Sequence, residues 1–226
     1  MPSLDGEILA WVEFAKGKPA TVKLVASKHK SHIKSALVGS VLGVSAGISL
    51  AQAGKDPKSA LSVDNQMDDV LSGLYDDAVS AGSKHGGILM GLGFGTLLGL
   101  SIAMSRIGKD LSEISTGIGN TSLNLATSQI TNGVANGSTP DVISTAVNNA
   151  VASPNRLDMI AQTEANRGFN VGLNESFQSN GVQQFRWVNI EGTSCPECSA
   201  MAGVHDITDS VPPLHPDCLC TIEPIE

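Results

Sequence analysis

Residues 194–220 read SCPECSAMAGVHDITDSVPPLHPDCLC and contain all four cysteines of the 226-residue chain. Cys195 and Cys198 form a C-x-x-C pair, in which two thiolates can reach one cation from a single turn. A second donor group, H-x-x-C-x-C, follows after a loop and comprises His215, Cys218 and Cys220. Two ligand-bearing turns separated by a loop are the usual arrangement around tetrahedral Zn²⁺. The stretch therefore predicts a structural zinc site.

Five donors compete for the four positions of this zinc site. Our preferred ligands are Cys195, Cys198, His215 and Cys218. Cys220 is the alternative fourth ligand or a structural thiol, and His205, in the loop, is a weaker candidate. Two disulfides are a competing interpretation, but we expect no secretory signal and hence no oxidising compartment. A redox-active C-x-x-C would follow a strand within a βαβ pattern, which does not surround this pair. No open metal position or nearby general base is evident, so we do not expect a catalytic zinc.

The composition of the chain argues against a single aromatic-rich globule and against nucleic-acid binding. Hydrophobic residues make up 41% of the chain but aromatic residues only 4%, and there are 24 glycines. The net charge is −8, whereas binding to phosphates needs clustered Lys and Arg. Six lysines do lie between Lys16 and Lys34, without an acidic residue among them. We expect this basic segment to be solvated surface rather than a contact to phosphate or anionic lipid.

Two long uncharged stretches, residues 35–54 and 85–105, carry small residues at a spacing of four. Both run into Gly-Lys-Asp, so we interpret them as an internal repeat. Residues four apart share one face of a helix, and a row of glycines there is a groove into which another backbone fits. This pattern predicts two glycine-zipper helices. The helix-packing glycines are Gly39, Gly43, Gly47, Gly87, Gly91, Gly95 and Gly99.

A glycine-lined helix needs a partner surface, because each Gly costs about 1 kcal/mol relative to Ala in a helix. We favour a buried helical hairpin or an oligomer contact as that surface. Membrane insertion under some conditions is the alternative. Its apolar residues contribute only roughly −3 kcal/mol per stretch, which the serines and glycines largely offset, so insertion would be marginal.

The remaining sequence predicts further helices and one strand. Residues 61–82 form an amphipathic pattern with a solvated acidic face, and residues 111–137 predict one poorly specified helix and a linker. An N-cap residue followed by proline opens a helix at Thr139-Pro140 and again at Ser153-Pro154. We expect the second of these helices to extend to about Phe177. The aromatic and β-branched run that starts at Gly181 predicts a strand.

The predicted fold class is α+β, with a mostly helical N-terminal region and a small α+β zinc-knuckle domain at the C-terminus. We expect a basic N-terminal segment and a helical glycine-zipper region, then a linker with a short helix, and finally the zinc-knuckle domain. Their predicted ranges are 1–34, 35–131, 132–153 and 154–226.

Three segments in order resemble a known family: TEANRGFNVG at 163–172, GVQQFRWVNIEGTSCPECSAMAGVHDI at 181–207 and PPLHPDCLC at 212–220. Together they resemble the C-terminal domain of phage Mu F-like head morphogenesis proteins, the minor capsid proteins of many tailed phages. The resemblance covers roughly residues 150–226. The positions that fall on the family pattern are Thr163, Glu164, Trp187, Cys195, Pro196, Cys198, Gly203, Pro213, His215, Pro216, Cys218 and Cys220. Of these, Thr163, Glu164, Trp187 and Gly203 are expected to be structural.

The chain departs from the family pattern at two positions. Glu191 stands where the family commonly has Asp, and Leu219 stands where it commonly has Arg between the last two cysteines. The change to Leu219 removes a charge that could pair with Glu164, which puts that internal salt bridge in doubt. The thiol and imidazole donors are all retained.

The resemblance implies a non-enzymatic virion component that enters the particle during procapsid assembly in the host cytoplasm. It implies a place inside the head at or near the portal vertex, with the portal protein and the inner capsid or scaffold as partners, and an influence on DNA packaging or ejection. Residues 1–150 contain no H-E-x-x-H or P-loop motif, and we expect no enzyme and no sequence-specific nucleic-acid binding. The alternative is a membrane-active effector, delivered with the phage DNA, whose two zipper helices insert as a hairpin. Self-association and membrane contact stay open.

Overall fold

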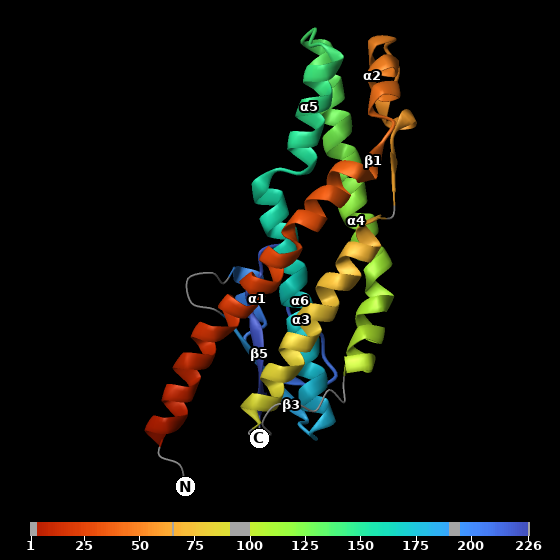
Figure 1. Cartoon of the computed structure of the whole chain (residues 1–226). Helices are drawn as coiled ribbons and strands as arrows, with labels where there is room; N and C mark the ends of the chain where they lie inside the picture. The colour runs from red at the N-terminus through yellow and green to blue at the C-terminus, as the bar shows by residue number, and fades with distance from the viewer. Residues whose placement is uncertain (1–3, 65, 91–99, 190–194, 226) are drawn as a thin grey trace. The chain divides into compact units, whose positions relative to one another are not determined.

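The computed structural model describes residues 4–64, 66–90, 100–189 and 195–225 (Figure 1). The chain is mostly helical, with small sheets, and it divides into two compact units that are each discontinuous in sequence. The first unit comprises Met1–Lys28, Leu74–Ile107 and Met159–Glu226, and the second comprises His29–Gly73 and Gly108–Asp158.

Helices account for most of the described residues. In chain order they are α1 (Leu4–Ser40), α2 (Val44–Gln52), the short 3-10 helix η1 (Pro57–Ala60), α3 (Gln66–Leu89), α4 (Leu100–Ala135), α5 (Pro140–Val151), α6 (Pro154–Ser179) and α7 (Pro196–Ala200). The strands are β1 (Val41–Leu42), β2 (Ser62–Val63), β3 (Gln184–Val188), β4 (Gly203–Asp206) and β5 (Thr221–Ile225).

The first unit contains a three-stranded antiparallel sheet in the order β4-β3-β5. In the central strand β3, Phe185 and Trp187 are buried while Gln184 and Arg186 are exposed. This alternation is the period of two that a half-buried strand requires, and it confirms the strand predicted after Gly181. The strands on either side, β4 and β5, were not predicted.

Helices α3 and α6 of the first unit approach each other backbone to backbone. A Cβ placed on Gly82 of α3 would lie 2.0 Å from the carbonyl oxygen of Phe169, and one on Gly172 of α6 would lie 2.3 Å from the carbonyl oxygen of Val79. Each helix carries two glycines four residues apart: Gly82 and Gly86 on α3, and Gly168 and Gly172 on α6. Any side chain at these positions would hold the two helices apart.

The second unit combines a small β-ribbon with packed helices. Strands β1 and β2 pair antiparallel, with Val41 opposite Val63. Helix α5 buries Ile143, Val147 and Val151, which are spaced four residues apart. Ile143 packs against Gly133 of α4, where an added Cβ would lie 2.5 Å from its side chain. Helix α5 is therefore held along one apolar face.

The prediction of one glycine-zipper helix over residues 35–54 is wrong. Helix α1 ends at Ser40, two residues form β1, and Gly43 then adopts φ 81° before α2 begins. A Cβ on Gly43 would lie 2.0 Å from the carbonyl oxygen of Ala60, so this glycine permits a tight turn rather than lining a helix groove. Gly39 and Gly47 consequently lie on different helices.

The second zipper stretch is described only in part. Gly87 is buried within α3, whereas Gly91, Gly95 and Gly99 lie outside the described residues. Across the part of the chain that the structure describes, no helix has both the length and the apolarity needed to cross a membrane.

A helix is present within residues 111–137 as predicted, but the linker predicted there is wrong, because α4 continues unbroken to Ala135. One face of α4 buries Ser122, Ala126 and Ile130, so tertiary packing overrides the weak helix propensity of its Ser, Thr, Asn and Gly residues. Hydroxyl groups on α4 donate to carbonyls one turn earlier, as Thr121 does to Gly117 at 3.0 Å.

The other predicted helices are present. Helices α5 and α6 begin at Pro140 and Pro154, as the proline signals indicate. The amphipathic helix predicted over 61–82 is α3, which starts later, at Gln66, because residues 62–63 pair with β1.

Candidate metal centre

Cys195 and Cys198 lie at the start of the short helix α7. Cys195 is the N-cap residue, Pro196 occupies the first helical turn, and the Cys195 sulfur accepts a hydrogen bond from the Cys198 N–H at 3.4 Å. This is the capping geometry that a side-chain acceptor followed by proline favours. This capping geometry places Cys195 and Cys198 on the single turn that begins α7, and Cys198 is buried.

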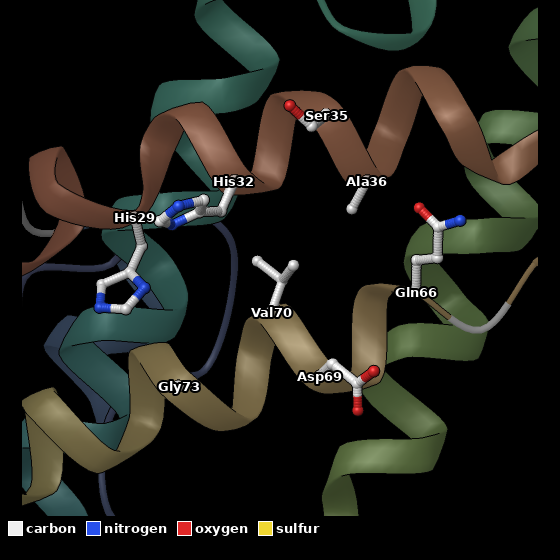
Figure 2. A pocket seen from close by; sticks show the side chains of 8 residues that line it. All are labelled: His29, His32, Ser35, Ala36, Gln66, Asp69, Val70 and Gly73. Carbon is white, nitrogen blue, oxygen red and sulfur yellow. The ribbon is translucent and has the colours of Figure 1, made fainter.

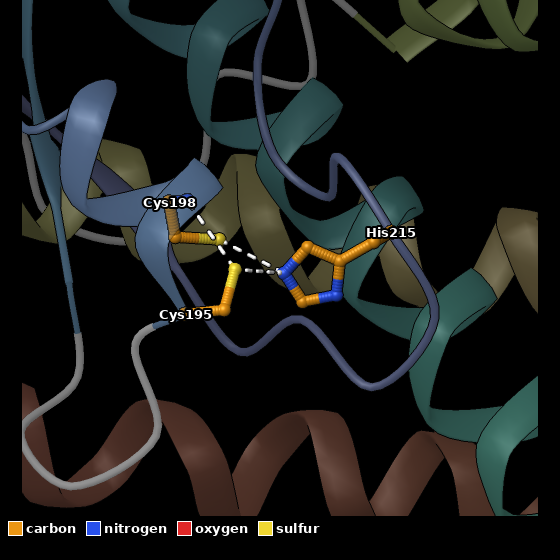
Figure 3. A group of neighbouring side chains, drawn as sticks. All are labelled: Cys195, Cys198 and His215. Atoms are coloured by element: carbon orange, nitrogen blue, oxygen red, sulfur yellow. Dashed lines mark hydrogen bonds between the residues drawn. The ribbon is translucent and has the colours of Figure 1, made fainter.

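His215 faces these two sulfurs from the loop that precedes β5 (Figure 3). Its Nε2 lies 3.1 Å from the Cys195 sulfur and 3.0 Å from the Cys198 sulfur. Its Nδ1 donates to the Pro216 carbonyl at 2.7 Å, a bond that also raises the pKa of the His215 imidazole. Metal-binding histidines usually hold the second ring nitrogen in this way, which directs the other nitrogen at the metal.

Cys218 and Cys220 join the cluster through Cys198. The sulfurs of Cys198 and Cys218 are 3.6 Å apart, and the donors form two groups, Cys195–Cys198–His215 and Cys198–Cys218–Cys220, that share Cys198. The Cys220 thiol also donates to the Asn189 side-chain oxygen at 3.4 Å. The four cysteines form no disulfide, since a bonded pair of sulfurs would be about 2.05 Å apart.

The donor set fits zinc. Two thiolates bound to one tetrahedral Zn²⁺ at about 2.3 Å lie about 3.7 Å apart, close to the 3.6 Å between the Cys198 and Cys218 sulfurs. Thiolate sulfur with one imidazole nitrogen is also the donor chemistry that Zn²⁺ prefers. Cys195, Cys198 and His215 would hold the ion, and Cys218 or Cys220, which belong to a separate donor group joined through Cys198, would supply the fourth ligand. A zinc ion there would crosslink α7 to the loop before β5.

The electrostatics of the thiols show why a cation suits this cluster. Burial raises the pKa of the Cys198 thiol to about 12, whereas a hydrogen bond from the Cys220 thiol lowers the pKa of Cys218 to about 5. The N–H of Cys198 lowers the pKa of Cys195, and the pKa of Cys220 is raised. Without a cation the cluster therefore favours only some of its thiolates, and a divalent ion would stabilise the others.

A row of side-chain amides on α6, which the sequence analysis missed, binds the backbone beside the sulfurs. Asn166 donates to the carbonyls of Cys218 and Cys220, and Asn170 donates to the carbonyl of Cys220. Further along, Asn174 and Gln178 both donate to the carbonyl of Ile207. The signal in the sequence was the spacing: four amide residues follow one another at intervals of four, which is one face of a helix. We name Asn166, Asn170, Asn174 and Gln178 the amide row.

Thr163 and Glu164, at the start of the family pattern, have different partners. Thr163 Oγ1 accepts a hydrogen bond at 3.0 Å from the N–H of Asp217, a residue with φ 59°. Glu164 is buried, and its carboxylate accepts from Tyr75 Oη at 2.6 Å and from Arg167 Nε at 2.8 Å. The side chain of Arg167 is therefore a cationic partner of Glu164 on the same helix.

Trp187 and Gly203 are paired across strands β3 and β4, with Trp187 buried and Gly203 at φ 141°. His205, the weaker ligand candidate, lies outside the two donor groups. Its ring stacks on Phe185 with centroids 5.4 Å apart, and its Nε2 bonds the Met201 carbonyl at 2.7 Å. The His205 imidazole is thus a packing residue of the sheet.

A separate pocket of about 340 Å³ lies within the second unit, between α1 and α3 (Figure 2). His29 and His32 from α1 and Asp69 from α3 are among its lining residues. The donor atoms of these residues do not converge, and the metal-ligating groups found in the described ranges all belong to the cysteine and histidine cluster. We therefore assign the candidate metal centre to that cluster.

Comparison with known proteins finds one family that part of the chain matches. Residues 126–223 match the family model described as Phage Mu protein F like protein. The match begins within α4, ends within β5 and includes the four cysteines and His215. No curated protein and no solved structure gives a significant match. The resemblance inferred from the cysteine and histidine motif is thus confirmed: residues 126–223 are similar to the Phage Mu protein F like family.

Proposed function

We propose that this chain is a minor capsid protein of a tailed bacteriophage and acts in head morphogenesis. The observation that carries the proposal is the match of residues 126–223 to the Phage Mu protein F like family, together with the intact donor cluster inside that range. The proposed role is structural rather than enzymatic.

In this proposal the zinc site stabilises a small docking domain. A sheet of three short strands is a small core, and small domains commonly gain stability from a structural metal. Bound zinc would join α7 to the loop before β5, next to the amide row of α6. The chain would then offer a rigid surface to its partner during assembly.

The finer features of the role are part of the same proposal. The partners are the portal protein and the inner capsid or scaffold, and the chain lies inside the head near the portal vertex. It assists DNA packaging or ejection without reading sequence, in keeping with its net charge of −8. Support for these features comes from the family resemblance alone. No observation favours the membrane-active alternative, and we do not propose it.

The test is a complementation experiment in the phage that encodes this chain. The gene is deleted, and wild type, Cys198→Ser or Ser210→Ala is supplied in trans. Ser210 is an exposed residue between the two donor turns, so it serves as the matched control. We expect wild type and Ser210→Ala to enter purified particles and restore the titre, and Cys198→Ser to fail in both. Mass spectrometry of the particles and plaque counts provide the readout. An undiminished titre after deletion, with the chain absent from wild-type particles, would refute the proposed function.

A further inference from the structure

We propose that Asn166 and Asn170 are positioning residues of the zinc site, which hold the Cys218–Cys220 segment ready to bind the metal. The inference rests on the proposed zinc site. Neither amide belongs to the donor set, and both act through the backbone of the residues that carry the sulfurs.

The contacts are short and converge on one segment of four residues. Asn166 Nδ2 lies 2.8 Å from the Cys218 carbonyl oxygen and 3.2 Å from that of Cys220. Asn170 Nδ2 lies 3.1 Å from the Cys220 carbonyl oxygen. One turn earlier, Thr163 accepts the N–H of Asp217 at 3.0 Å. Thr163, Asn166 and Asn170 are three and four residues apart, so one face of α6 fixes the segment from Asp217 to Cys220.

Because Asn166 and Asn170 are buried, their hydrogen bonds favour one conformation of the Cys218–Cys220 segment. Asn166 is 1% exposed and Asn170 is 0% exposed, so water has little access to replace either amide. If an amide were lost, the carbonyls of Cys218 and Cys220, which are themselves buried residues, would lack that partner. The segment would then move to satisfy those carbonyls, and the sulfurs would move with it.

The helix that carries the amides is itself held in place. Gly168 and Gly172 bring α6 into contact with the backbone of α3, and Glu164 accepts from Tyr75 on α3. Groups on a well-anchored helix keep ligand positions more accurately than groups on loops. The amides can therefore preorganise the ligand segment before zinc binds.

The effect should be confined to one side of the site. Neither amide bonds the backbone of Cys195 or Cys198 among the described contacts, so these two ligands should be unaffected. Asn166 bonds the carbonyl of Cys218, the preferred fourth ligand, and its loss should weaken zinc binding more than the loss of Asn170.

The experiment measures the dissociation constant of Zn²⁺ on the full chain by competition with a chromophoric chelator. Asn166→Ala and Asn170→Ala are compared with wild type and with Asn174→Ala. Asn174 is the matched control, because it is equally buried and belongs to the same amide row but bonds Ile207 instead of the ligand segment. We expect zinc binding about 10 to 100-fold weaker in the first two variants, as is usual for residues that orient metal ligands. Asn174→Ala should keep the wild-type affinity although it loses thermal stability.

A second variant and a spectroscopic readout separate positioning from folding. Asn166→Asp keeps the side-chain volume but cannot donate when ionised, so it should weaken zinc as Asn166→Ala does. With Co²⁺ in place of zinc, the thiolate charge-transfer absorbance at saturation should match wild type, since no ligand is removed.

Two results would overturn the inference. If wild type binds zinc and Asn166→Ala binds it equally well, or if Asn174→Ala is weakened as much as Asn166→Ala, the amides serve only the fold. If the wild-type chain binds no zinc, the proposed metal site is wrong as well as the inference about the amides. The measurement on wild type therefore distinguishes a failure of the metal site from a failure of the amide inference alone.

Discussion

Tyr75 on α3 donates a hydrogen bond of 2.6 Å to the carboxylate of Glu164 on α6. Tyr75 is 0% exposed and Glu164 is 6% exposed, and Arg167 supplies a second bond to the same carboxylate. Hydrogen bonds to a carboxylate at a buried site are stronger than those between neutral groups. This pair joins α3 to α6 at the same interface where the glycines bring the two backbones together.

We predict that Tyr75 resists ionisation as long as the protein is folded. Burial, followed by the adjacent Glu164 carboxylate, raises the pKa of Tyr75 well above its ordinary value of 10.0. The unfolded chain loses the phenolic proton near pH 10 and the folded chain does not. The contribution of Tyr75 to stability is therefore complete below pH 10 and is lost as the pH rises above 10 toward the folded-state pKa. Tyr75 is the only tyrosine of the chain, so tyrosinate absorbance in the near ultraviolet reports on it alone.

The control for this titration is the chain unfolded in denaturant, which should ionise near pH 10. The folded chain should show tyrosinate only together with loss of helical circular dichroism. Reversible ionisation near pH 10 with the helical signal intact would contradict the buried Tyr75–Glu164 pair.

Because α3 and α6 touch at their glycines, we predict that a single added methyl group at this contact lowers the free energy of unfolding strongly. An added Cβ on Gly172 would lie 2.3 Å from the Val79 carbonyl oxygen, which is backbone and cannot rotate away. Gly172→Ala should therefore force the helices apart and lower the free energy of unfolding by about 1–3 kcal/mol or more. Gly117→Ala is the matched control, because Gly117 is an exposed glycine of α4 with nothing within 4 Å of an added Cβ. It should stabilise the protein by up to about 1 kcal/mol. Urea denaturation measures both, and equal stability of the two variants would disprove the close contact.

The same contact shows what sequence patterns could and could not locate. Small residues at a spacing of four predict glycine-zipper helices over 85–105 and 35–54, but the former stretch lies partly outside the described residues and the latter is not one helix. There, Gly43 is needed for a turn with positive φ, which a pattern of glycine positions alone cannot distinguish from a helix groove. Of the glycines that line the contact, Gly86 lies in the uncharged stretch 85–105, whereas Gly82, Gly168 and Gly172 lie outside both uncharged stretches.

Sequence signals that act on the local backbone predicted the helix starts correctly. Features that depend on tertiary contacts, such as the length of α4, could not be predicted from the sequence. Pro140 and Pro154 mark helix starts, because the fixed φ of proline acts within its own residue. The continuity of α4 depends on the burial of Ala126 and Ile130 against other elements. The cysteine and histidine spacing predicted a cluster that the structure does bring together, whereas the hydrogen bonds of Asn166 reach a loop 52 residues away in sequence.

Arg156 in the second unit should be important for stability although it forms no described salt bridge. It is 8% exposed and donates to the carbonyls of Val151 and Ile118 and to Ser122 Oγ. These bonds cap the end of α5 and join it to α4. Arg156→Met keeps much of the volume but removes the guanidinium donor, which leaves the Ile118 carbonyl with only its bond from Ser122 Oγ. We expect a loss of about 1–3 kcal/mol per buried acceptor left unpaired.

The control for Arg156 is Arg186→Met, since the Arg186 side chain is exposed on β3. That substitution should change the free energy of unfolding by no more than about 0.5 kcal/mol. If urea denaturation gave both variants the stability of wild type, the buried guanidinium would not join α4 to α5 as described.

The shared position of Cys198 predicts unequal effects of serine at the four cysteines. Cys198 belongs to both donor groups, so Cys198→Ser removes a sulfur from either possible ligand set and should abolish stoichiometric zinc binding. Cys220 belongs to one group only and also donates to Asn189, so Cys220→Ser should retain about one zinc per chain with weaker binding. Inductively coupled plasma mass spectrometry of the purified full chain gives the zinc content, and thiol labelling before and after chelation gives the number of protected cysteines. Two outcomes would show that a different set of ligands holds the metal. In the first, Cys198→Ser keeps the zinc content of wild type. In the second, Cys220→Ser loses all its zinc while Cys218→Ser keeps the zinc content of wild type.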